Sequence, residues 1–381
     1  MINKDRLIRL TQRVLQFNSV NPPGNEYELA QFIIKDLKSI KLDVKTVSYQ
    51  PKRPNVIATL KGSWPRKKAI QEAILITPHI DTVPFGTGWK FNPTGGEIKG
   101  GRIYGRGASD DKGNCAVGME VLRSLVEDGV RLKRDIIFAA TVDEETGSHH
   151  GIRPLLEEGV LKPKVALITD SEDFDTIVAQ KGLFHTRVQV FGRKAHGAYN
   201  WLGVSAIEIS ARIIDRLKRY KFKCRKHALL VPPTVNIGTI KGGDKVNMVA
   251  DFCEFSVDIR YLPDMTADGV LKEMKAIIEK ETKNYKVIVD DSQRPYEIDA
   301  SHPFVKTYVD AAKKMGIEAE LKGSQGATVI TFFQDYGIPA FSTGWGARGT
   351  MHANDEYAEI KTLYNGARLL EQYLKDYDAI A

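Results

Sequence analysis

The chain has 381 residues, of which 42% are hydrophobic and 27% charged, and its formal net charge is +7. This composition is typical of a soluble globular protein of two domains and excludes a disordered or fibrous chain. The basic residues are dispersed and lack interleaved aromatic residues, so we expect no nucleic-acid partner.

Membrane and secretion signals are absent from the sequence. No window reaches the roughly 18 apolar residues that a spanning helix needs, and the charged segment 1–17 has no apolar signal-peptide core. The cysteines Cys115, Cys224 and Cys253 are odd in number and widely spaced, which favours a reducing compartment over a disulfide framework. We therefore expect a cytoplasmic protein without a membrane partner.

The first part of the chain alternates between predicted helices and strands. Helical spacing of apolar residues predicts helices at 5–17 and 27–40, and a further helix at 114–125. Short apolar runs predict strands at 55–60, 73–77, 136–142 and 165–169. Strands separated by helices predict an α/β domain with a mostly parallel sheet.

The middle of the chain predicts a second, smaller domain. Strand 186–191, helix 204–218, strands 234–240 and 252–259, helix 267–280 and strand 285–289 follow one another. This β-α-β-β-α-β order is that of a ferredoxin-like domain. Helix 303–315, strand 318–321 and helix 360–374 then return to the first domain. We expect one domain of residues 1–182 and 293–381, interrupted by a domain of residues 183–292.

Imidazole and carboxylate groups follow the predicted strands of the first domain. They are His79 and Asp81 after 73–77, Glu144 and Glu145 after 136–142, Asp170 after 165–169, and Asp110 in a glycine-flanked loop before helix 114–125. Strand ends converge where open α/β sheets bind ligands. Because adjacent carboxylates repel one another unless a cation or proton lies between them, the pattern indicates a metal site. An exposed acidic turn is the alternative for the glutamate pair alone.

Ordered motifs across nearly the whole chain carry a specific resemblance. They are 79–81, 105–113, 143–145, Asp170, 192–197, Gly242-Gly243 with Asn247, 258–260 and 352–356. In this order the chain resembles the dinuclear-zinc family of acetylornithine deacetylase, succinyl-diaminopimelate desuccinylase, glutamate carboxypeptidase and aminoacylase. The resemblance implies a catalytic metal-binding domain with an inserted dimerisation or lid domain.

The resemblance also implies a ligand set. His79 and Asp170 would bind one divalent ion, Glu145 and His352 the other, and Asp110 would bridge them, with a cis peptide bond after Asp110. Zinc is the expected metal, with cobalt or manganese as substitutes. The ions would activate a water molecule for attack on an amide carbonyl.

Further roles follow from the same resemblance. Glu144 would be the general base. The two-residue spacing of His79 and Asp81 on an extended chain, rather than the resemblance, favours Asp81 for holding the second ring nitrogen of His79. His196, on the inserted domain, would stabilise the oxyanion in the active site of a partner subunit, which predicts a homodimer. Asn247 and Arg260 would bind polar groups of the substrate. The alternatives are a surface role for His196 and, for Arg260, a local ion pair with Asp258.

The leading functional hypothesis is a metal-dependent amidohydrolase that removes an N-acyl group from an amino acid. A dipeptidase or carboxypeptidase with the same site is the first alternative, and a non-catalytic binding or scaffold protein on the same fold is the second. Relatives often carry Gly-Thr-Asp late in the catalytic domain, whereas segment 323–328 has no aspartate. The substrate therefore stays open between an N-acyl amino acid and a short peptide.

Overall fold

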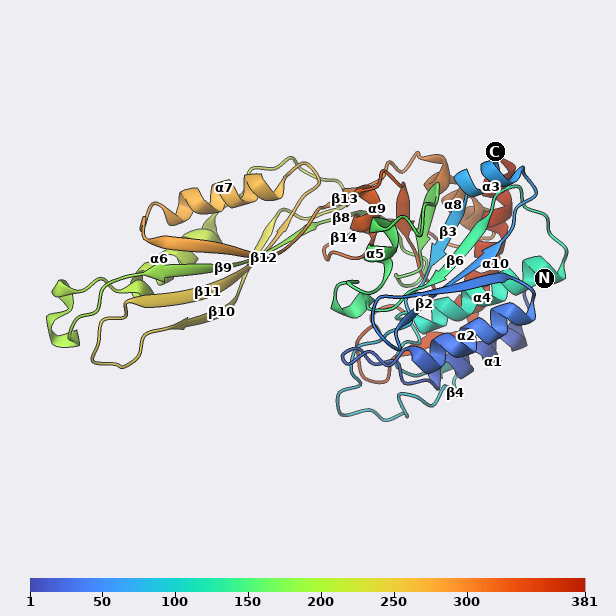
Figure 1. Ribbon diagram of the computed structural model, residues 1–381, viewed down its shortest axis with the longest axis horizontal. Coiled ribbons are helices and arrows are strands. Elements are labelled where there is room, and N and C mark those ends of the chain that lie inside the picture. The colour runs from blue at the N-terminus through green and yellow to red at the C-terminus, as the bar shows by residue number, and fades with distance from the viewer. Residues whose placement is uncertain (381) are drawn as a thin grey trace. The chain divides into compact units, whose positions relative to one another are not determined.

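The computed structural model describes residues 1–380, which form two compact units (Figure 1). Unit 1 comprises Met1–Val178, Ile298–Lys322 and the chain from Phe332 onward, and unit 2 comprises Ala179–Glu297 and Gly323–Thr331. These units are defined by compactness, so the functional domain boundaries expected at 182/183 and 292/293 stay a prediction.

Unit 1 contains a central sheet with a parallel core. The strand order is β1-β2-β6-β3-β7-β15-β8. Parallel pairings join β6 (Ile136–Ala140), β3 (Ile74–Thr77), β7 (Val165–Ile168) and β15 (Ala340–Ser342). Antiparallel strands flank them: β1 (Asp43–Ser48) and β2 (Pro54–Leu60) on one side, and β8 (Thr176–Gln180) on the other. Every residue of β3 and β7 is buried, as expected for strands covered on both faces.

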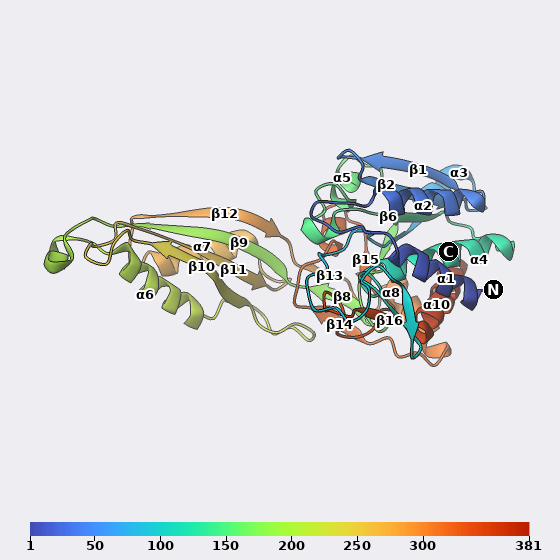
Figure 2. The same ribbon diagram turned by 90° about the horizontal axis from the view of Figure 1, so that it is seen from below.

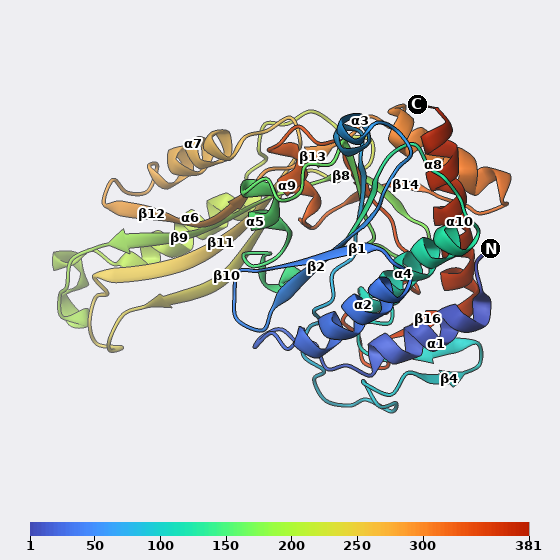
Figure 3. The ribbon, with the colours of Figure 1, turned by 45° about the vertical axis from the view of Figure 1, so that its right-hand side comes forward.

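Helices cover this sheet through amphipathic faces. In α1 (Lys4–Leu15) the buried residues recur at helical spacing, and the Asn3 side chain accepts the Arg6 N–H at the start of the helix. Helix α1 packs against α4 (Lys112–Glu127), α4 against α10 (Ile360–Ala379), and α10 against α8 (Pro303–Lys314), as Figure 3 shows. Helix α2 (Tyr27–Ser39) packs against β2. The remaining elements are α3 (Arg66–Gln71), α5 (Ile152–Glu157), α9 (Ile330–Gln334), and a small sheet of β4 (Glu97–Lys99), β5 (Arg102–Tyr104) and β16 (Tyr357–Glu359).

The lysine-rich segment 61–68, which runs from the end of β2 into α3, is anchored to the body of unit 1. The Gly62 N–H and the Arg66 guanidinium both donate to the buried carboxylate of Asp135. The Lys68 ammonium lies 3.6 Å from the centre of the Trp64 ring. These contacts give the segment a structural explanation.

Unit 2 contains the ferredoxin-like element order that the sequence predicts. Strands β9 (Gly182–Phe191), β10 (Thr234–Gly242), β11 (Phe252–Tyr261) and β12 (Tyr285–Gln293) form an antiparallel sheet in the order β10-β11-β9-β12 (Figure 2). Helices α6 (Ala206–Arg219) and α7 (Ala267–Ile278) follow β9 and β11. The α/β fold class with an inserted ferredoxin-like unit is confirmed.

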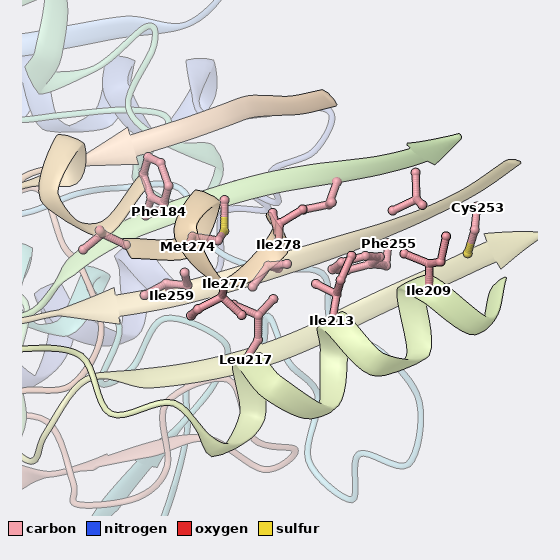
Figure 4. Close-up of a cluster of buried hydrophobic side chains, with 14 of the residues drawn as sticks. Phe184, Ile209, Ile213, Leu217, Cys253, Phe255, Ile259, Met274, Ile277 and Ile278 are labelled. Atoms are coloured by element: carbon pink, nitrogen blue, oxygen red, sulfur yellow. The ribbon is translucent and has the colours of Figure 1, made fainter. Parts of the chain in front are cut away.

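The core of unit 2 lies between this sheet and the two helices. Burial alternates strictly along β11, so one face of the sheet is covered. Ile209, Ile213 and Leu217 of α6 point toward the sheet and belong to the same buried cluster as Phe255 (Figure 4). The spacing of these α6 residues is the i, i+4, i+8 pattern of a helix that buries one stripe.

Two further observations concern single elements. The strand expected at 318–321 is wrong in position, because β14 comprises Leu321–Ser324. The short β13 (Tyr296–Glu297), which was not expected, pairs with the end of β8.

Among the helices of residues 1–380, none combines the length and apolar character that crossing a membrane requires.

Candidate active site

The acidic and imidazole side chains of unit 1 meet at one edge of its central sheet. His79 follows β3, Glu144 and Glu145 form a short 3-10 turn after β6, and Asp170 follows β7. Because β6, β3 and β7 are parallel neighbours, their carboxyl ends lie at the same edge. Ligand atoms of His79, Asp110 and Glu145 lie within 4.8 Å of one another, and so do those of His79, Glu144 and Asp170.

Asp110 lies between two histidines that are far apart in sequence. Its Oδ1 is 2.9 Å from His79 Nε2, and its Oδ2 is 3.0 Å from His352 Nε2. His352 Nε2 is also 3.2 Å from Glu145 Oε2. The Asp110–Asp111 peptide bond is cis, as the resemblance implied. This carboxylate therefore has the arrangement of a group that can bridge two cations.

The electrostatics of the cluster favour bound cations. Burial, together with the charge of Asp170, raises the pKa of Glu144 well above its ordinary value. Burial and the nearby Asp110 raise the pKa of Asp170 to about 7. Hydrogen bonds with Asp110 and Glu145 raise the pKa of His352 to about 10. These carboxylates lack sufficient positive charge around them, and imidazole with carboxylate is a donor set that zinc, cobalt or manganese accepts. The residues fit a metal centre.

Asp81 connects His79 with the turn that carries the glutamates. The backbone oxygen of Asp81 lies 3.0 Å from His79 Nδ1, and its Oδ1 lies 3.4 Å from the same nitrogen. Its carboxylate accepts the backbone N–H groups of Glu144 and Glu145, each at 3.1 Å. Asp81 is fully buried. Through these hydrogen bonds it holds the His79 ring and the turn of Glu144 and Glu145 in place.

Glu356 holds the loop of Asp110, a role that sequence reasoning missed. Its carboxylate accepts the backbone N–H groups of Gly107, Ser109 and Asp110 at 2.9–3.1 Å and is 2.8 Å from Arg106 Nη1. Glu356 ends the 352–356 motif, which was the signal available in the sequence.

Asp111 and Asn114 support the opposite side of the cluster, and they were also missed. Asp111 Oδ2 accepts the His79 backbone N–H at 3.1 Å, and its Oδ1 accepts from Asn114 Nδ2 at 2.6 Å. The same Asn114 nitrogen donates to the Thr169 carbonyl at 2.7 Å, one residue before Asp170. This side-chain pair therefore ties the histidine segment to the Asp170 segment.

The other candidate residues belong to unit 2. His196 is exposed and accepts the Ala198 N–H on Nδ1 at 3.1 Å. The Gly197 N–H donates to the Asn247 carbonyl at 2.8 Å, so the loops of His196 and Asn247 are adjacent. Arg260 Nε is 2.8 Å from Asp258 Oδ1, the local ion pair that was the alternative for this residue. Catalytic and substrate-binding roles for His196, Asn247 and Arg260 stay predictions.

Comparison with known proteins gives a family match and similar folds. The family model described as Peptidase family M20/M25/M40 matches residues 75–376. Aminopeptidase PepT from Bacillus cereus has a TM-score of 0.83 and 24% identity over 99% of both chains. A tripeptidase from Staphylococcus aureus has a TM-score of 0.82 and 24% identity over 100% of both chains. An M20 family metallo-carboxypeptidase from Sulfolobus solfataricus has a TM-score of 0.79 and 20% identity over 98% of this chain and 100% of that one. The structural likenesses show the fold.

Proposed function

We propose that this chain, which belongs to peptidase family M20/M25/M40 and is a metal-dependent hydrolase of amide or peptide bonds, acts on short peptides. The observation that carries the hydrolytic chemistry of this proposal is Asp110 held between His79 and His352, with Glu144 and Asp170 in the same cluster. The scaffold alternative is not favoured, because the candidate base and the candidate ligands occur together.

The proposed metal centre uses the residues of this cluster. His79 and Asp170 would hold one ion, Glu145 and His352 the other, and Asp110 both. Two bound divalent ions would polarise the scissile carbonyl and lower the pKa of water. Zinc is the proposed metal, with cobalt or manganese as substitutes.

The side chains of unit 1 would handle the proton and the orientation. The Glu144 carboxylate would take the proton from the attacking water and deliver it to the leaving amine nitrogen. Asp81 would fix the His79 ring through Nδ1 and hold the Glu144 backbone, so that both groups keep their places during the reaction.

The descriptions of similar proteins support peptides as the substrate class. They name an aminopeptidase, a tripeptidase and a metallo-carboxypeptidase. N-acyl amino acids, the leading expectation from the sequence, are the second candidate, because the motif order resembles that of deacetylases and desuccinylases. Both classes present an amide carbonyl to the same machinery.

We further propose a homodimer in which His196 of one subunit donates to the oxyanion in the partner's active site, with Asn247 and Arg260 binding substrate. Exposed apolar side chains beside His196 support the interface, since Trp201 is 71% and Leu202 60% exposed. Strand β10 is an unpaired edge of its sheet, which offers backbone groups to a second copy. The cytoplasmic location stays a prediction.

The test is hydrolysis by metal-reconstituted protein. Chelator-treated protein is loaded with zinc, cobalt or manganese and assayed against dipeptides, tripeptides, N-acetyl amino acids and N-succinyl amino acids. We expect metal-dependent cleavage of peptides. Cleavage of N-acyl amino acids alone would overturn the peptide assignment in favour of the second candidate.

A matched variant tests the general base. Glu144→Gln is expected to bind two zinc ions as the wild type does, with kcat lower by about 10²–10⁴-fold. A full rate in this variant would overturn the role of Glu144. Light scattering coupled to gel filtration tests the homodimer, which a monomeric mass at assay concentration would contradict.

A further inference from the structure

We propose that Arg53 is a positioning residue for hydrolysis, which holds the turn of Glu144 and Glu145 through a buried contact with Asp143. This inference rests on the proposed function. It assigns a role in the reaction to a side chain that belongs to no motif of the metal site.

The Arg53 guanidinium connects two buried carboxylates. Its Nη2 is 2.5 Å from Glu26 Oε1, and its Nε is 3.0 Å from Glu26 Oε2. Its Nη1 is 3.0 Å from Asp143 Oδ1. The side chains of Arg53, Glu26 and Asp143 are 5%, 0% and 3% exposed. Such desolvated charges need one another, because removing one partner leaves the others buried and unpaired.

The backbone around Glu26 is shaped to admit this guanidinium. Gly24 has φ of +94°, and a Cβ there would lie 2.4 Å from Arg53 Nε. A residue with a side chain would therefore displace the arginine. The same loop provides Asn21, whose Nδ2 donates to Asp81 at 2.8 Å and to Asp143 at 3.2 Å.

Asp143 is the point at which this network meets the active-site turn. It has a left-handed φ of 68° directly before Glu144. Its carboxylate also accepts the Thr146 hydroxyl at 2.6 Å and the His150 N–H at 3.0 Å. The conformation of the turn thus depends on the Asp143 side chain being held in one place.

The consequence is a direct path from Arg53 to the reacting groups. With Arg53 present, Asp143 and Asp81 fix the turn from two sides, because Asp81 holds the N–H groups of Glu144 and Glu145. Without it, Glu26 and Asp143 each lose the buried cation that they contact, and Asp143 is held by Asn21, Thr146 and His150 alone. A displacement of about 1 Å at a catalytic group can lower the rate by about 10²-fold.

The test compares Arg53→Ala with Arg134→Ala in zinc-loaded protein. Arg134 is a buried arginine of unit 1 that donates to the Tyr377 carbonyl at 3.0 Å, and its ion-pair partner is Asp378 at the end of α10. Both variants are expected to lose thermal stability. Only Arg53→Ala is expected to lose kcat, by about 10–100-fold, while its KM changes by less than about threefold. In competition with a chelator, this variant should also bind one of the two zinc ions about tenfold more weakly.

Two additions make the test decisive. Millimolar guanidinium chloride should restore part of the kcat of Arg53→Ala and none of any loss in Arg134→Ala. If Arg53→Ala does not fold, Arg53→Lys takes its place, and it should show an intermediate kcat because an ammonium cannot reach both carboxylates with the same geometry.

Equal kinetic and zinc-binding behaviour of the two alanine variants, or a kcat loss that guanidinium does not restore, would overturn the positioning role while leaving the proposed function intact. Arg53→Lys with wild-type kcat would do the same. Wild-type protein that binds no zinc and cleaves no amide would instead overturn the proposed function, and this inference with it.

Discussion

Glu356→Gln should destabilise unit 1 strongly although it changes only one atom of the side chain. One carboxylate oxygen accepts the N–H groups of Ser109 and Asp110, and the other accepts from Gly107 N–H and Arg106 Nη1. An amide keeps one oxygen, so its NH₂ group must face two of these donors. Because the Glu356 side chain is fully buried, a water molecule from bulk solvent cannot take the place of the lost acceptor.

The magnitude follows from these contacts. A lost hydrogen bond to a charged group costs about 1.5–3 kcal/mol, and a buried charge left without its partner costs about 3–5 kcal/mol. Arg106 keeps its hydrogen bond to the Ala353 carbonyl at 3.1 Å and its cation–π contact with the Trp89 ring, and these interactions offset part of the loss. We therefore expect the free energy of unfolding to fall by about 3 kcal/mol, a large share of the about 5–15 kcal/mol of a typical protein.

Urea unfolding followed by tryptophan fluorescence measures this change, since Trp89 and the buried Trp345 lie in unit 1. The matched control is Glu359→Gln. Glu359 forms an exposed pair with Arg102 at 3.8 Å, so the control should stay within about 0.5 kcal/mol of wild type. Exposed ion pairs contribute at most about 1 kcal/mol. A Glu356→Gln variant whose free energy of unfolding lies within about 1 kcal/mol of the control would therefore refute the reasoning.

Three further changes have defined outcomes. Asp81→Asn should weaken zinc binding by about 10–100-fold, measured by chelator competition, because an amide has one oxygen and cannot accept both the Glu144 and the Glu145 N–H. Unchanged affinity would contradict the orienting role of Asp81. Phe255→Ala should lower the stability of unit 2 by about 3–5 kcal/mol in thermal unfolding, since the ring is fully buried, and a loss below about 1 kcal/mol would argue against that core. Iodoacetamide should modify Cys224 alone in the native protein, because Cys253 is buried and burial also raises the pKa of Cys115. Mass spectrometry would count more than one adduct if this were wrong.

The site was partly predictable because its side chains follow strands whose apolar runs are easily recognised. His79, Glu144 and Asp170 come directly after three parallel neighbours, and parallel strands bring their carboxyl ends together. Glu356 and Arg53 were not predictable in this way. Their partners lie 246 residues (Asp110) and 90 residues (Asp143) away, 356 − 110 and 143 − 53, and no local periodicity encodes such a contact.

The fold followed the same pattern. Long amphipathic helices and buried strands have clear periods, so α1, α6 and β11 lie close to their predicted ranges. Strand β1 was missed because it is an exposed edge strand with no clear alternation, and β15 because it has only 3 residues. Short and exposed strands are stabilised by their neighbours rather than by their own sequence.

The late position of His352 in the sequence, far from the other side chains of the cluster, has a consequence for biosynthesis. His352 follows Glu145 by 207 positions, and the whole of Ala179–Glu297 is made between them. At about 5–20 residues per second, a ribosome needs about 10–40 s to pass from one to the other. Throughout that interval the nascent polypeptide displays His79, Asp110 and Glu145 without the imidazole that completes the cluster. On the proposed ligand set, both ions can therefore be bound only after translation has passed His352.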